Sequence, residues 1–160
     1  MAAFVYNIFK GDVVSGTYIW ANSLTSYIIN ATLVTGSYAP TASHVYASAF
    51  SGSELSSTSH AAGYAGSLRL SLVSTFISVN NTAIAGSAGR VEIGASATTW
   101  SGISAGCAAA VILLAESAGG ANSNGNTRLI AYIDTGGFPI LTNGGDLQIT
   151  WASAGILQNT

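Results

Sequence analysis

The residue types that most often carry catalysis are sparse in this chain. The two histidines, His44 and His60, lie in Ser- and Ala-rich segments, and Glu54 is the only acidic residue within about ten positions of them. A zinc centre needs three or four ligands, and a catalytic triad needs a nucleophile, a base and an acid together. Local spacing builds neither arrangement, so we expect both histidines to be solvated loop residues.

The carboxylates are dispersed along the chain rather than paired. Asp134 and Asp146 could meet across a hairpin, but acid–base catalysis also needs a pocket that perturbs their pKa values. We therefore interpret both as loop caps, Asp12 as a helix-end partner and Glu54 as a loop tether. The Gly-rich segments contain no GxxxxGK[ST] phosphate loop, and the Gly-Phe-Pro sequence at 137–139 is typical of a turn.

The single cysteine, Cys107, cannot form a disulfide within the chain. It precedes the apolar run Ala108 to Val111 and has no neighbour that would activate a thiolate. We expect a small buried hydrophobic residue here rather than a reactive thiol. The sequence thus predicts no catalytic, cofactor-binding or metal-binding residue, and an enzyme is the least favoured class of function.

Charged residues make up only 6% of the 160 residues, with four Lys or Arg and six Asp or Glu. An ordinary soluble domain carries roughly 25%. The surface must therefore consist mainly of Ser, Thr, Asn, Gly and Ala. Such a surface is cheap to desolvate, because neutral hydroxyls and methyl groups lose less hydration energy than charges do. The composition favours a protein that packs against neighbours in an assembly.

The same composition argues against two classes of partner. A net charge of −2 and four scattered basic residues give no footprint for a phosphate backbone, so we expect no nucleic acid ligand. The mean hydropathy is +0.46, but the longest apolar run, Cys107 to Ala115, is far shorter than the roughly 20 residues of a spanning helix. We expect no membrane partner, and the first residues do not resemble a secretory signal.

The length favours a single domain over residues 1–160, with a core that needs no disulfide or metal. Residues 27–35 are rich in β-branched side chains and end at Gly36, and residues 67–73 alternate polar and apolar almost strictly. Both patterns predict strands. Further strands are expected at residues 90–93, 97–100, 108–115, 127–133 and 146–151. Helical crossovers are missing, so the sequence predicts an all-β fold, an antiparallel β-sandwich or jelly-roll-like architecture.

One segment near the start has helical spacing instead. Phe4, Ile8 and Phe9 fall close together before Gly11 interrupts, which predicts a short N-terminal amphipathic helix. This helix could close one end of the sandwich, which we favour, or serve as an arm that docks on a neighbouring subunit.

The aromatic residues allow two interpretations. Trp20, Trp100 and Trp151 lie in or beside expected strands and are most simply core residues. Exposed tryptophans and tyrosines would also suit a carbohydrate-binding platform. Tyr38, Tyr46 and Tyr64 are candidates for such a platform because they fall in loop-like stretches.

Several motifs occur in an order that resembles a known family. They are Val5-Tyr6-Asn7-Ile8-Phe9-Lys10; Ile29 to Pro40 (INATLVTGSYAP); Glu54 followed by Gly63-Tyr64-Ala65-Gly66; Thr99-Trp100-Ser101; Leu129 to Asp134 (LIAYID); and Thr142 to Trp151 (TNGGDLQITW) before Gly155-Ile156-Leu157. Together they cover most of the chain and are similar to a family of small virion proteins of tailed bacteriophages. This chain departs from the family pattern in carrying far fewer charges, so contacts that relatives would make through salt bridges are not expected to carry over to it.

The resemblance implies a non-enzymatic structural component of the virion. We expect a capsid decoration or cement protein on the outer capsid surface, made in the host cytoplasm. Its partners would be the major capsid protein and copies of itself in a symmetric homo-oligomer, with a trimer preferred by analogy. The alternatives are a neck or tail component and a carbohydrate-binding virion module. The loops at Ser51 to Gly66 and Ser117 to Asn126 are the expected contact surfaces.

Overall fold

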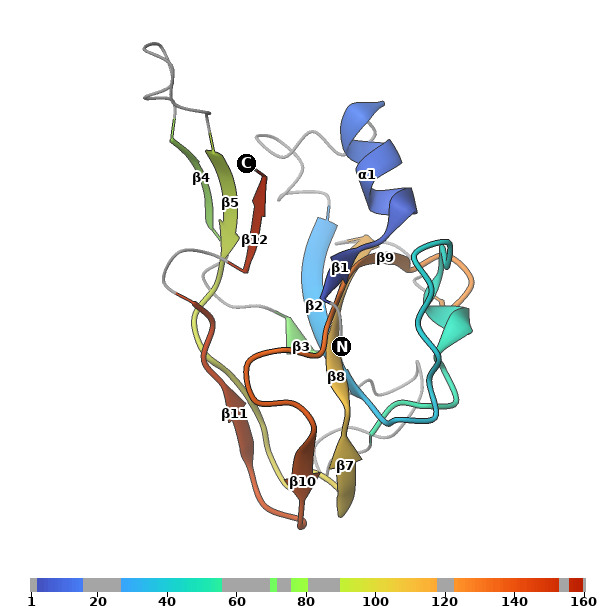
Figure 1. The fold of residues 1–160 in the computed structure, drawn as a ribbon, viewed down its shortest axis with the longest axis vertical. Coiled ribbons are helices and arrows are strands. Elements are labelled where there is room, and N and C mark those ends of the chain that lie inside the picture. Colours follow the sequence, from blue (N-terminus) through green and yellow to red (C-terminus); the bar gives the residue numbers. More distant parts are fainter. Residues whose placement is uncertain are drawn as a thin grey trace.

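The computed structural model describes residues 3–15, 27–55, 70–71, 76–80, 90–117, 123–152 and 156–159. Figure 1 shows the arrangement of its elements. In chain order they are β1 (Phe4–Val5), α1 (Asn7–Val14), β2 (Tyr27–Val34), the 3-10 helix η1 (Ala47–Ala49), β3 (Leu70–Ser71), β4 (Phe76–Asn80), β5 (Arg90–Gly94), β6 (Thr98–Trp100), β7 (Gly106–Ala108), β8 (Ala110–Ser117), β9 (Arg128–Ile133), β10 (Ile140–Thr142), β11 (Leu147–Ile149) and β12 (Leu157–Asn159). All strand pairs are antiparallel. The structure confirms the expected all-β class with a short N-terminal helix.

The central sheet has the strand order β1-β9-β8-β2-β3. Its longest pairing joins β2 to β8, with Leu33 opposite Val111 and Thr32 opposite Ile112. Alternate residues of β8 enter different core clusters: Val111 and Leu113 point to one face, Ile112 and Leu114 to the other. Both faces are therefore covered, which explains why the strand is a continuous apolar run rather than an alternating one.

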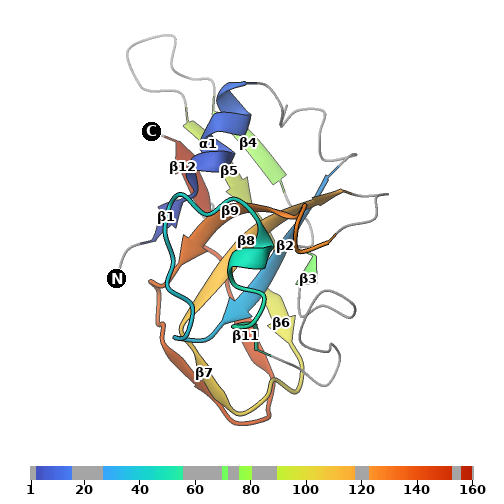
Figure 2. The same cartoon turned by 90° about the vertical axis from the view of Figure 1, so that its right-hand side faces the viewer.

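One face of this sheet is covered by residues 35–55, which we call the covering loop. Figure 2 looks onto this loop where it crosses the sheet. Tyr38, Ala47 and Phe50 pack there against the side chains of Ile112 and Leu114. Backbone bonds join loop to sheet, from the Ala47 amide to the Thr127 carbonyl (3.0 Å), from Leu129 to Val45 (3.1 Å) and from Leu55 to Leu33 (3.0 Å). These bonds satisfy backbone groups that burial would otherwise leave without partners.

The other face is covered by the pairs β6–β11 and β7–β10 of a long ribbon. The pair β5–β12 continues this ribbon, with β4 as a third strand beside β5. Ile93 lies opposite Leu157, Trp100 opposite Leu147, and Ala108 opposite Ile140. Between the last two pairs the ribbon is interrupted. There the Gly102 amide donates to Asp146 Oδ1 (2.9 Å) and the Ile103 amide to the Gly145 carbonyl (2.9 Å).

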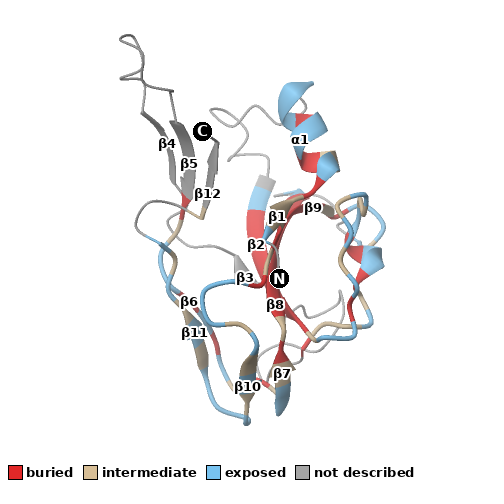
Figure 3. Ribbon diagram, in the orientation of Figure 1, coloured by how far each residue is buried: buried red, intermediate tan, exposed pale blue. Residues whose placement is uncertain are grey.

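The ribbon continues into the central sheet. Only residue 109 separates β7 from β8, and β8 pairs with β9 just as β7 pairs with β10. The chain from residue 90 to residue 159 is thus one long antiparallel hairpin, bent so that its ribbon half lies over its sheet half. The side chains of Trp100 and Ile103 join the core cluster of Leu33 and Leu113, and Figure 3 shows buried residues concentrated along β2 and β8.

The predicted helix exists with different bounds. Phe4 belongs to strand β1, because its backbone pairs with Tyr132, and the helix begins only at Asn7. Gly11 does not end it, since the helix continues to Val14. Helix α1 buries Phe9 and Asp12 against its own chain at one end of the molecule (Figure 1).

Most predicted strands are confirmed with shifted ends. Residues 27–35 form β2, residues 90–93 form β5, and residues 97–100, 127–133 and 146–151 contain β6, β9 and β11. The strand expected at 108–115 is split between β7 and β8, and runs on to Ser117. Of the strand expected at 67–73, Leu70–Ser71 forms β3 and the rest lies outside the described residues.

Candidate functional site

Most of the charged side chains that the structure describes are buried or half-buried. Asp12, Glu116 and Asp134 are buried, Glu54 and Arg128 are half-buried, and Lys10 and Asp146 are exposed. The side chains of Arg69, Arg90 and Glu92 lie outside the described ones. Asp146 is in turn engaged by the Gly102 amide, as the loop-cap interpretation predicts. Over the described residues, the molecular surface is therefore almost free of available charge.

Asp12 and Arg128 form an ion pair between α1 and β9. The Nη1 atom of Arg128 lies 2.6 Å from both carboxylate oxygens of Asp12, and the side chains are 31% and 8% exposed. Asp12 had been expected at a helix end. It lies instead within α1, on the face that meets the sheet, so the pair holds the helix in place.

Two further carboxylates, those of Glu116 and Glu54, accept hydrogen bonds from side chains in or beside the central sheet. Asn30 Nδ2 donates to Glu116 Oε2 (2.6 Å), and Thr127 Oγ1 donates to Glu116 Oε1 (3.4 Å). Thr32 Oγ1 donates to Glu54 Oε1 (3.3 Å), and Glu54 forms a β-bridge with Val34. Glu54 is thus a loop tether, as predicted, and Glu116 fixes β2 beside β8.

A chain of hydrogen bonds links the covering loop to the core. The buried hydroxyls of Tyr6 and Tyr38 lie 3.0 Å apart, and the Tyr38 hydroxyl lies 2.7 Å from His44 Nδ1. The rings of His44, Phe50 and Tyr132 pack around Tyr38. The expectation of a solvated His44 is wrong, because this side chain is half-buried and its Nδ1 hydrogen-bonds with the Tyr38 hydroxyl.

Burial raises the pKa values of the tyrosines in this cluster. Desolvation raises the pKa of Tyr6 above its ordinary value of 10.0, and the hydrogen bond to Tyr38 adds to the effect. Desolvation likewise raises the pKa of Tyr38, against a smaller lowering from its bond to Tyr6. The pKa of Tyr132 is raised by desolvation first and by nearby Asp134 second. These hydroxyls therefore stay protonated at neutral pH and act as structural hydrogen-bonding groups.

The tyrosines proposed for a carbohydrate platform are not gathered on the surface. Tyr38 is buried, which contradicts its assignment to an exposed loop, and Tyr46 is 37% exposed. Tyr64 and His60 lie outside the described residues, as does Trp20. Sequence reasoning misplaced Tyr38 because Gly, Ser and Pro surround it, although the loop that carries it covers a sheet face.

The remaining tryptophans divide between core and groove. Trp100 is buried in the core, as predicted. Trp151 is half-buried, and its Nε1 donates to Thr98 Oγ1 (2.9 Å), which fixes the indole across the ribbon. One edge of the ring borders a groove beside the central sheet.

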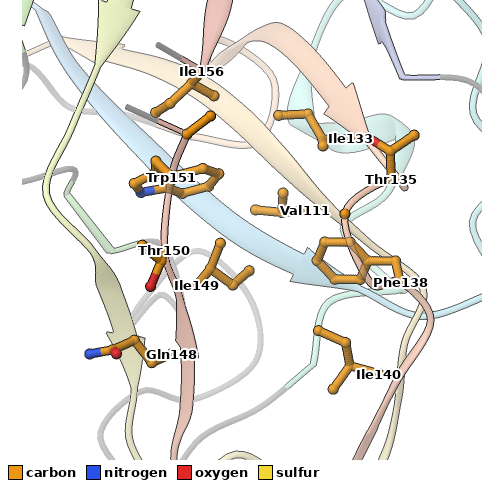
Figure 4. A pocket seen from close by; sticks show the side chains of 12 residues that line it. Val111, Ile133, Thr135, Phe138, Ile140, Gln148, Ile149, Thr150, Trp151 and Ile156 are labelled. Carbon is orange, nitrogen blue, oxygen red and sulfur yellow. The ribbon is translucent and has the colours of Figure 1, made fainter. Parts of the chain in front are cut away.

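This groove has a volume of about 420 Å³. Figure 4 shows Trp151, Ile149 and Ile156 on one wall, Phe138, Ile140 and Ile133 on the other, and Val111 at the floor. Thr135, Gly136, Gln148, Thr150 and Ala152 complete the lining, which contains no charged residue. A site of this composition suits an uncharged apolar group.

Cys107 also lies in a different setting from the one expected. It is half-buried in β7 rather than buried, and its cross-strand neighbour is Leu141 of β10. Leu141 is 84% exposed. The apolar run suggested burial, but it is the neighbouring Ala108 that faces the core.

The loops expected to form contact surfaces are described only in part. Ser51 to Leu55 close the covering loop, with Leu55 buried and Gly52 exposed. Residues 56–66 lie outside the described ones. In the second loop, Ser123, Gly125 and Asn126 are exposed, and residues 118–122 lie outside the described ones.

No protein-family model, no curated protein and no solved structure matches the chain. The resemblance to phage virion proteins stays a prediction from the motifs.

No three side chains among the described His, Cys, Asp and Glu residues lie close enough together to hold a metal ion. None of the helices in the described ranges is long and apolar enough to cross a membrane.

Proposed function

We propose that this protein is a non-enzymatic structural component of a bacteriophage virion, a capsid decoration or cement protein that binds the assembled capsid lattice as a symmetric homo-oligomer. The observation that carries the proposal is the placement of charge. Of the seven charged side chains that the structure describes, Asp12, Glu116 and Asp134 are buried and only Lys10 and Asp146 are exposed, so the described surface carries little charge. Neutral surfaces are those that protein interfaces desolvate at least cost.

The described chemistry supports a structural role. The carboxylates of Asp12, Glu54 and Glu116 are held by Arg128, by Thr32, and by Asn30 with Thr127, respectively, and the tyrosine cluster connects a loop to a sheet. Each of these groups has a partner that stabilises the fold. An enzyme would instead need such groups to converge on a pocket, and the groove is lined by uncharged residues.

The finer architecture belongs to the same proposal. A bent hairpin that covers one face of a five-stranded sheet suits an antiparallel sandwich or jelly-roll-like domain. Such a domain presents loops and ribbon ends on a rigid scaffold, which is where contacts to a lattice are best made.

The proposed mechanism is mass action. A protein that binds the assembled lattice and not the free subunits stabilises the lattice by its binding free energy. Several linked binding sites in one oligomer raise the effective concentration of each further site. The partners are the major capsid protein and further copies of this chain, with a trimer as the preferred state, on the outer surface of particles assembled in the host cytoplasm.

Two alternative functions fit some of the same observations. A neck or tail component would share the neutral surface and the β-rich fold, and differs in the number of copies per particle. A carbohydrate-binding virion module is less favoured, because Tyr38 is buried and only Tyr46 of its proposed tyrosines is exposed among the described residues.

Washing particles that carry the protein at ~0.1 M and ~1 M NaCl tests the neutral interface. Salt screens exposed ion pairs over about 10 Å at 0.1 M and about 3 Å at 1 M, but it does not weaken contacts between neutral groups. We expect the protein to stay on the particles at both concentrations. Release at the higher concentration alone would mean that ion pairs hold it, against the proposal.

A further inference from the structure

A prominent apolar side chain stands on the ribbon, on the side away from the groove. Leu141 is 84% exposed, and it lies between Ile140 and Thr142 in β10. Successive side chains of a strand point to opposite faces. Ile140 lines the groove (Figure 4), so Leu141 points away from it.

The groove and Leu141 are complementary in chemistry. The groove is lined by isoleucines, Phe138 and Trp151, carries no charge, and has a volume of about 420 Å³. A cavity of about 150 Å³ already accepts a benzene ring, so the groove has room for a leucine side chain and part of its strand. Asp146, the exposed charge between β10 and β11, accepts a hydrogen bond from the Gly102 amide.

We propose that Leu141 of one copy inserts into the groove of a second copy, so that identical chains assemble head to tail. This inference rests on the homo-oligomer of the proposed function and names the surfaces that form it. Transfer of an exposed leucine to an apolar site is favourable, and two uncharged surfaces meet without desolvating an ion.

The positions of the two surfaces set the symmetry. Because Leu141 and the groove are different surfaces on opposite faces of the ribbon, the contact is heterologous. A heterologous contact closes into a ring when its rotation divides a full turn, and the preferred trimer is such a ring. A twofold contact would need Leu141 and the groove in one surface patch, and their positions on opposite faces of the ribbon do not allow this.

The first test compares Leu141→Asp with Val14→Asp by light scattering on a sizing column. Val14 is the matched control, because it is 89% exposed and lies on α1, at the far end of the molecule from β10 (Figure 1). We expect Leu141→Asp to reduce the mass to that of the 16.1 kDa monomer. Val14→Asp should keep the wild-type mass.

The second test uses a variant that blocks the groove. Thr150 is exposed at the groove, so Thr150→Glu adds a charge there without disturbing the core. We expect this variant to be monomeric. When it is mixed with Leu141→Asp, its intact Leu141 can enter the intact groove of the other variant, and the mixture should form dimers and nothing larger.

The outcomes separate this inference from the proposed function. A wild-type oligomer whose mass is unchanged by Leu141→Asp or by Thr150→Glu would overturn the head-to-tail contact alone. A mixture that stays monomeric would do the same. A wild-type protein that is monomeric at every concentration would overturn both the contact and the homo-oligomer, whereas binding of that monomer to particles would still support the decoration role.

Discussion

At the scale of single residues, the hydroxyl of Tyr38 has the largest structural role that we identify. It lies within hydrogen-bonding distance of the Tyr6 hydroxyl and of His44 Nδ1. One buried oxygen therefore connects the covering loop to Tyr6, which lies between β1 and α1. A buried polar group that loses its partner keeps its desolvation cost, so removing this oxygen affects all three residues.

We predict that Tyr38→Phe lowers the free energy of unfolding by about 1–3 kcal/mol, because Tyr6 and His44 both lose a partner inside the protein. Tyr46→Phe on the same loop is the matched control. Its ring is 37% exposed, and we expect a change within about 0.5 kcal/mol. Urea unfolding followed by tryptophan fluorescence measures both. Equal effects of the two substitutions would contradict the role of Tyr38.

The same cluster predicts a loss of stability at alkaline pH. The pKa values of Tyr6, Tyr38 and Tyr132 are raised in the folded protein, so the folded state holds these protons more tightly than the unfolded state. Their contribution to stability is complete below the unfolded pKa of 10.0 and falls as the pH rises above it. Urea midpoints at pH 8, 9, 10 and 11 should therefore decline chiefly above about pH 10.

Tyr38→Phe provides the control for the alkaline prediction. It removes one of the raised hydroxyls and one partner of Tyr6, so the decline above about pH 10 should become shallower. An unchanged decline would assign the alkaline loss of stability to other groups.

Some side-chain roles were predictable from residue type. The capping role of Asp146 and the tether role of Glu54 were predicted correctly, because carboxylates in turn-rich segments commonly accept such bonds. Their partners, Gly102 and Thr32, are 44 and 22 residues away and were not predicted. Tyr38 and His44 were misplaced because a Gly-, Ser- and Pro-rich segment looks solvated, and only the sheet beneath the loop makes it a buried layer. The groove was not foreseen, since its walls come from residues 111 to 156.

At the scale of elements, the turn between β9 and β10 sets the positions of both the groove and Leu141. Gly136 and Gly137 have φ values of 75° and 115°, in the region that favours glycine. This turn carries Phe138 to the groove and begins β10 two residues later. The direction of Ile140 and Leu141 therefore depends on its geometry.

We predict that Gly137→Ala costs about 1–3 kcal/mol of stability, because an L-residue is strained at positive φ. Gly36→Ala is the control, since Gly36 has no positive φ and a Cβ there would meet nothing within 4 Å. Thermal unfolding of the two variants should separate them. A Gly137→Ala protein as stable as Gly36→Ala would show that the turn relaxes at no cost.

Longer elements were predicted better than short ones. Strands β2, β8 and β9 carry enough β-branched or apolar residues to be recognised, and the sequence placed them within two or three residues. Strands β1, β4, β10 and β12 were missed. β1, β10 and β12 have only two or three residues, which carry no period, and the five-residue β4 was missed although it is longer. Long-range pairing along the bent hairpin, which places these strands, is invisible to local patterns.

At the scale of the whole molecule, low charge is the property that connects sequence, fold and proposed function. The composition predicted a surface of neutral groups, and the fold reduces the available charge further by burying Asp12, Glu116 and Asp134. The sequence could not predict which charges are buried, because that depends on the contacts of β2, β9 and α1. A surface of this kind favours a role in an assembly.

The central claim is that this protein decorates a capsid lattice. The most direct measurement is its copy number in purified particles, by quantitative mass spectrometry against the major capsid protein. We predict about one copy for every one to three capsid subunits, as a symmetric oligomer on a repeating lattice requires. A ratio near one copy per about a hundred capsid subunits would contradict decoration and place the protein in the neck or tail.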